Sequence, residues 1–156
     1  MEMEILDLLS QKGVVPNLKV SSKKQALQEI SSHAAQITGL QDRLIFDVLL
    51  ERERLGTTGV GRGIAIPHGK LKELDCLQSV FARLSKPVDF DSIDEQPVDL
   101  IFLLLAPETA GADHLKALAR ISRLFRDEHV CRKLRDSDEA EALYALLVEP
   151  SVSSAA

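Results

Sequence analysis

Apolar residues recur at helical spacing soon after the N-terminus. A helix is predicted over residues 21–37, where Ser22 and Gln25 resemble a capping box and Gly39 stands where helices commonly end. Its apolar face consists of Leu27, Ile30, Ala34 and Ile37. A second helix is predicted over residues 42–55. Its apolar face consists of Leu44, Ile45, Val48 and Leu49.

Strand-like patterns occupy the middle of the chain. Residues 64–66 form a short apolar run, and residues 79–84 alternate in the manner of a half-buried strand. Residues 98–105 are apolar except for Asp99, which is typical of a strand covered on both faces. The helices expected after these strands run from about Asp113 to Phe125, over 130–134 and over 138–148.

This order of elements predicts the fold class. Helices before, between and after short strands indicate an α/β layered domain. The chain has 156 residues and neither an internal repeat nor a linker, so residues 1–150 are expected to form one domain. Residues 151–156 are small and polar and are expected to form a disordered tail.

Charge and apolar runs exclude two classes of partner. The net charge of −5 gives a nucleic-acid partner no overall electrostatic support. The longest apolar run, residues 100–106, is too short for direct membrane insertion. The acidic N-terminus lacks the basic region of a signal peptide, so a cytoplasmic location is expected. In that compartment Cys76 and Cys131 are expected to be free thiols and not a disulfide.

A glycine-rich stretch at residues 59–63 separates the second helix from the strand at 64–66. Nucleotide-binding loops run in the opposite order, from strand through glycines into a helix whose N-terminus holds phosphate. We therefore interpret the stretch as a flexible turn that is also compatible with close approach to a bulky ligand.

Four histidines are the candidates for chemistry, and none has metal-ligand spacing. His68 lies between Pro67 and Gly69 at the expected end of a strand, where a reactive group and an ordinary turn histidine are both consistent with the sequence. His114, at the start of a predicted helix, is either a surface residue or a neutral hydrogen-bond donor. The remaining two, His33 and His129, are interpreted as structural or surface residues.

Two stretches carry a resemblance to a known family. Residues 52–71, RERLGTTGVGRGIAIPHGKL, and residues 97–128, PVDLIFLLLAPETAGADHLKALARISRLFRDE, resemble the IIA proteins of the bacterial phosphoenolpyruvate-dependent phosphotransferase system. The branch is the mannitol/fructose/nitrogen type. The GKL after the histidine and the SKKQAL helix start are most similar to its nitrogen-regulatory members.

The resemblance implies a three-layer α/β/α domain with a small mixed sheet. It implies that His68 accepts a phosphoryl group from a phosphohistidine on an HPr-like carrier protein, with Arg52 and His114 stabilising the phosphate. It also implies that the protein is a phosphotransferase component that needs no cofactor or metal and acts mainly as a regulator of target proteins. Arg62 departs from the pattern, because a small polar residue is expected between the glycines of this branch.

Two alternatives remain open at this point. A IIA component of a sugar-transport system would use the same chemistry and pass the phosphoryl group to a IIB partner. A binding module whose His68 is never phosphorylated would use none of it. We also expect Arg52 to reach a shallow depression shared by the two histidines, with the loop at residues 59–63 on its rim.

Overall fold

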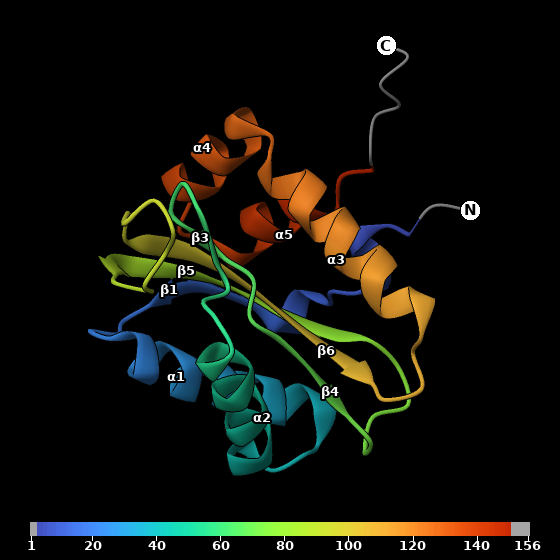
Figure 1. Cartoon of the computed structure of the whole chain (residues 1–156). Coiled ribbons are helices and arrows are strands. Elements are labelled where there is room, and N and C mark those ends of the chain that lie inside the picture. The colour runs from blue at the N-terminus through green and yellow to red at the C-terminus, as the bar shows by residue number, and fades with distance from the viewer. Residues whose placement is uncertain (1–2, 151–156) are drawn as a thin grey trace.

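A six-stranded mixed sheet forms the middle layer of the computed structural model, which describes residues 3–150 (Figure 1). The expected tail at 151–156 lies outside the described residues. The strand order is β1-β5-β6-β3-β2, and β4 also pairs with β6. The strands are β1 (Val14–Leu18), β2 (Gly59–Gly61), β3 (Ile64–Ala65), β4 (His68–Leu71), β5 (Gln78–Val88) and β6 (Val98–Pro107).

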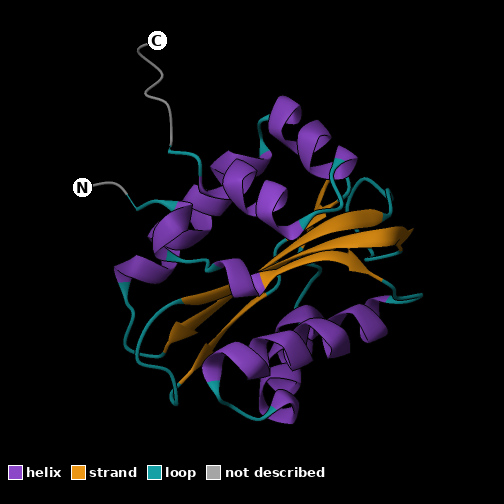
Figure 2. Cartoon of the chain, turned by 180° about the vertical axis from the view of Figure 1, so that it is seen from behind, coloured by secondary structure: helices purple, strands orange, loops and turns teal. Residues whose placement is uncertain are grey.

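Helices cover both faces of this sheet (Figure 2). One face carries α1 and α2, and the other carries α3, α4 and α5 (Figure 1). The helices are α1 (Lys23–Thr38), α2 (Asp42–Arg54), α3 (Ala112–Phe125), α4 (Glu128–Asp136) and α5 (Ala140–Val148). The chain before β1 contains two short 3-10 helices, η1 (Ile5–Asp7) and η2 (Gln11–Gly13). The predicted three-layer α/β/α architecture is confirmed.

Strand β6 is the centre of the core because it has a covered sheet face on each side. From Leu100 to Ala106 every residue is at most 1% exposed. Alternate side chains enter two separate apolar clusters, so Ile101 packs toward α1 and α2, whereas Phe102 packs toward α3 and α5. The continuous apolar run in the sequence is therefore a strand buried on both faces.

The predicted helix ends agree closely with the observed ones. The Ser22 hydroxyl accepts a hydrogen bond from the Gln25 amide at 3.1 Å, and Gly39 adopts the left-handed conformation after α1. The apolar pattern did not reveal β1, which is short and contains Pro16. Strand β1 pairs only with β5 at the edge of the sheet, where a residue without an amide hydrogen is tolerated.

The chain leaves the sheet briefly between β3 and β4. Both strands pair in parallel with β6, and Ile66 and Pro67 lie between them, where the Ile66 amide does not bond to β6 but the Pro67 carbonyl accepts from Leu104. Since proline has no amide hydrogen, it cannot continue the pairing pattern. His68 therefore begins a strand, and the prediction that it ends one is wrong.

Candidate functional site

His68 and His114 come from different elements and meet at one end of the sheet. His68 is the first residue of β4, opposite Leu104 of β6, and His114 lies in the first turn of α3, the helix that follows β6. Their ring centroids are 5.8 Å apart with a tilt of 55°. The pairing of β4 with β6 thus brings together two imidazoles that are far apart in sequence.

Arg52, near the end of α2, reaches the same place. Its Nε–H donates to Nε2 of His68 at 3.3 Å, and its Nη1 donates to the Gly56 carbonyl at 2.8 Å. Helix α2 lies close to β4 because Gly69 has no side chain, and a Cβ there would overlap Cγ1 of Val48. A glycine after the histidine therefore lets the arginine approach the ring.

The three side chains share a depression of about 440 Å³. Its other lining residues are Val48, Glu51, Arg54, Leu55, Gly69 and Lys70. Three cations and one acid thus line the depression, in a protein whose net charge is −5. Such a local excess of positive charge favours a phosphoryl group or another anion.

Hydrogen bonds assign the tautomer of the His68 ring. Nδ1 lies 2.8 Å from the Ile66 carbonyl oxygen, which can only accept, so Nδ1 carries the hydrogen. Nε2 then holds the free lone pair, and that nitrogen is the one that Arg52 faces. In this tautomer Nε2 is the ring nitrogen with a lone pair, so it is the nitrogen that is able to act as a nucleophile.

Burial keeps both imidazoles neutral. Desolvation lowers the pKa of His68 below the ordinary 6.5, and the Arg52 charge lowers it further, against the opposing effect of the Ile66 hydrogen bond. Desolvation also lowers the pKa of His114, with smaller contributions from His68 and Lys70. His114 is only 9% exposed, and its Nδ1 has no hydrogen-bond partner among the described residues.

The glycine-rich loop does not lie on the rim of the depression, so that prediction is wrong. Residues 59–63 form β2 and the turn that leads into β3, and none of them lines the depression. Arg62 adopts a left-handed φ of 57° at the tip, and its guanidinium donates to the Phe125 carbonyl at the end of α3. Arg135 of α4 donates to the Arg62 carbonyl at 2.7 Å. The unexpected arginine therefore ties the hairpin to α3 and α4.

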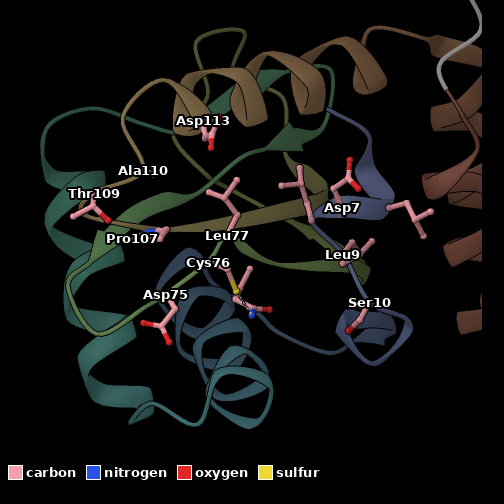
Figure 3. Close-up of a pocket in the computed structure, with 13 residues that line it drawn as sticks. Asp7, Leu9, Ser10, Asp75, Cys76, Leu77, Pro107, Thr109, Ala110 and Asp113 are labelled. Atoms are coloured by element: carbon pink, nitrogen blue, oxygen red, sulfur yellow. Dashed lines mark hydrogen bonds between the residues drawn. The ribbon is translucent and has the colours of Figure 1, made fainter. Parts of the chain in front are cut away.

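A larger cleft of about 620 Å³ lies elsewhere on the surface (Figure 3). Asp7, Asp75 and Asp113 contribute carboxylates to it, and Cys76 is exposed there. Its lining contains no lysine, arginine or histidine. A phosphoryl group would be repelled by these carboxylates, so the smaller depression is the better site for phosphate chemistry.

The described residues offer few other kinds of site. Between residues 3 and 150 there is no group of three or more His, Cys, Asp or Glu side chains placed to hold a metal ion. Over the same range, no helix has the length and apolar character needed to cross a membrane. Sequence reasoning missed Lys70 as part of the depression, although it stands two residues after His68 in the quoted motif.

Comparisons with known proteins agree with this geometry. Residues 7–149 match the family described as "Phosphoenolpyruvate-dependent sugar phosphotransferase system, EIIA 2". The chain is 58% identical to a nitrogen regulatory protein of Bradyrhizobium diazoefficiens over 98% of its length and 100% of the relative's. It is 40% identical to that of Escherichia coli K12, covering 94% of this chain and 91% of the relative. The crystal structure of nitrogen regulatory protein IIA-Ntr from Neisseria meningitidis superposes with a TM-score of 0.87 at 35% identity, covering 92% and 98% of the two chains.

Proposed function

Because this chain belongs to the EIIA type-2 family of the phosphotransferase system, we propose that it is a phosphocarrier whose His68 takes up the phosphoryl group. The donor is a phosphohistidine on an HPr-like carrier protein. The single observation that best supports this role is the orientation of the His68 ring. The Ile66 carbonyl holds the hydrogen on Nδ1, and Nε2 is left with its lone pair toward a cationic depression.

The transfer needs no proton movement at His68. The Nε2 lone pair attacks phosphorus, the new N–P bond forms, and the N–P bond to the donor imidazole breaks. Each ring keeps the hydrogen on its other nitrogen, and the donor leaves as a neutral imidazole. The reaction is nearly symmetric, so the site must supply positioning and charge stabilisation rather than a strong base.

Arg52 has two successive tasks in this proposal. Before transfer its Nε–H occupies the Nε2 lone pair, so the guanidinium has to move aside when the donor docks. Afterwards it binds oxygens of the new phosphoryl group, for which its planar set of donors is suited. His114 donates a further hydrogen bond from its neutral ring, because its lowered pKa keeps it from becoming a cation at neutral pH.

The destination of the phosphoryl group is proposed to be regulatory. Several relatives named nitrogen regulatory protein are 40% to 58% identical to this chain over nearly its full length. By contrast, the fructose-specific EIIABC component of Bacillus subtilis is 32% identical, and this chain covers 23% of it. We propose that the added charge on His68 alters binding to regulatory target proteins. The sugar-transport alternative predicts onward transfer to a IIB domain.

The test is labelling with phosphoenolpyruvate and the general carrier enzymes. Wild type should take up acid-labile phosphate, as a phosphoimidazole does, and the His68→Ala variant should fold and take up none. His129→Ala is the matched control, because His129 is exposed on α4 and lines no part of the depression. Full labelling of His68→Ala, or label that survives acid, would refute the assignment. Transfer from labelled protein to an added IIB domain would favour the transport role.

A further inference from the structure

Glu53 is a buried carboxylate beside the site that the transfer itself does not use. It follows Arg52 on α2 but points inward, with 4% of its side chain exposed. Both of its oxygens accept from the Thr58 amide, at 3.1 and 3.2 Å, and the Thr58 hydroxyl donates to the same carboxylate. The Lys23 ammonium lies 2.7 Å away and balances the charge. Such a fully satisfied buried group fixes its partners firmly.

Thr58 connects this carboxylate to the His68 ring. Its carbonyl accepts from the Ile66 amide at 2.9 Å, and the Ile66 carbonyl in turn accepts from Nδ1 of His68 at 2.8 Å. Glu53, Thr58, Ile66 and His68 thus form an unbroken series of hydrogen-bonded residues. No member of this series other than His68 lines the depression.

The main chain that carries the Ile66 carbonyl has few hydrogen bonds, although the Ile66 and Pro67 side chains are buried. Ile66 and Pro67 lie between β3 and β4, and the Ile66 amide makes its hydrogen bond to Thr58 instead of to the neighbouring strand β6. On the other side, the Pro67 carbonyl accepts from the Leu104 amide at 3.0 Å. The bond to Thr58 is therefore one of two main-chain anchors that set the direction of the Ile66 carbonyl.

We propose that Glu53 is a positioning residue that, through Thr58 and Ile66, holds the hydrogen of His68 on Nδ1 and so makes Nε2 the acceptor atom. The role of Nε2 as phosphoryl acceptor rests on the proposed function. The effect of Glu53 on the tautomer of His68 does not depend on phosphorylation. The Glu53 charge also raises the pKa of His68, which agrees with a functional link between the two groups.

Thr58 and Thr57 provide a matched pair of variants. Thr58→Val removes the hydroxyl that donates to Glu53. Thr57→Val makes the same change one residue away, where the hydroxyl donates to the Phe90 carbonyl at 2.6 Å and accepts from the Gly59 amide at 3.0 Å, both outside the series. Glu53→Gln keeps the shape and one acceptor oxygen but removes the charge opposite Lys23. Comparing the three variants distinguishes an effect transmitted to His68 through the series from an effect of lower overall stability.

The readout is the ring ¹⁵N NMR spectrum of His68 in the unphosphorylated protein at a pH where the ring is neutral. Wild type and Thr57→Val should show Nδ1 as the protonated nitrogen and Nε2 as the unprotonated one. In Thr58→Val and Glu53→Gln the two ¹⁵N shifts should move toward each other as the second tautomer becomes populated. Phosphotransfer to these two variants should slow by about three- to tenfold, less than the hundredfold that a 1 Å misplacement can cause.

Thermal melts complete the experiment. The proposal would be overturned if both Thr58→Val and Glu53→Gln kept wild-type ring shifts and transfer rates while their melting temperatures fell. Glu53 would then only stabilise the fold. Equal ring-shift changes in Thr57→Val would overturn it too. If wild type takes up no phosphate, the proposed function fails, but the ring spectra still decide whether Glu53 sets the tautomer.

Discussion

Arg52 offers the sharpest test of how the site stabilises a phosphoryl group. In the unphosphorylated protein its Nε–H is 3.3 Å from Nε2 of His68, slightly beyond the usual range for such a bond. Breaking it should therefore cost no more than a typical net hydrogen bond, about 0.5–1.5 kcal/mol. In the phosphorylated protein we expect the same guanidinium to bind the phosphoryl anion, and each such charge-assisted bond is worth about 1.5–3 kcal/mol.

The change to make is Arg52→Gln. We expect it to lower the equilibrium constant for phosphorylation by roughly tenfold, because the central values of the two energies differ by about 1.25 kcal/mol and each 1.36 kcal/mol changes an equilibrium constant tenfold. The pKa of His68 should rise in the same variant, because Arg52 lowers it in the wild type. The assay mixes the variant with a phosphorylated HPr-like donor and quantifies both phosphoproteins at equilibrium, and an NMR titration follows the pKa.

Arg54→Gln is the matched control. Arg54 also lines the depression, but its side chain is 68% exposed and lies 3.9 Å from Glu51 at the surface. We expect only a small effect there, because exposed charges are well screened. Equal yields for Arg52→Gln and wild type, or equal losses in the two variants, would refute the assigned role of Arg52.

Three further outcomes are expected. The pKa values of His68 and His114 are lowered in the folded state, so the unfolded chain binds more protons than the folded chain as the pH falls below 6.5. The free energy of unfolding, measured with denaturant, should therefore fall as the pH drops through that value. The slope should be flatter in His114→Ala. Gly69→Ala should cost about 1–3 kcal/mol in the same assay by overlap with Val48, and the added Val48→Ala should restore part of it; an unchanged midpoint would contradict the packing argument. Phosphorylation should change backbone amide NMR shifts only near the depression and the start of α3, whereas shifts across both sheet faces would indicate remodelling of the fold.

The local pattern of apolar and polar residues was sufficient to predict most of the helices and strands. Apolar spacing and end signals placed α1 within a few residues, because Ser22 and Gly39 act on their own neighbours in sequence. The buried strand at 98–105 was equally clear, since no helix-forming periodicity competes with its continuous apolar run. Strand β1 escaped detection because five residues with a central proline give too weak a signal.

The candidate site depended on tertiary structure to a much greater degree. The sequence by itself nominated His68 through its position between Pro67 and Gly69 and left His114 and Arg52 between surface and functional roles. The resemblance then assigned both of them to the phosphate. The sequence misplaced the glycine-rich loop, because glycines report conformational freedom and not which part of the molecule they face. Only the parallel pairing of β4 with β6 brings the two rings to 5.8 Å, a contact between residues 46 positions apart (114 − 68).

The protonation pattern of the acceptor is likewise a tertiary property. Sequence fixes the identity of the imidazole and its ordinary pKa, which leaves either nitrogen free to carry the hydrogen. The fold places the Ile66 carbonyl against Nδ1 and the Arg52 guanidinium against Nε2, and burial removes the water that would stabilise the cation. The sequence thus determined which residue is able to react, and the tertiary structure decided which of its atoms faces the depression, because hydrogen-bond direction and desolvation arise only from neighbours brought together by folding.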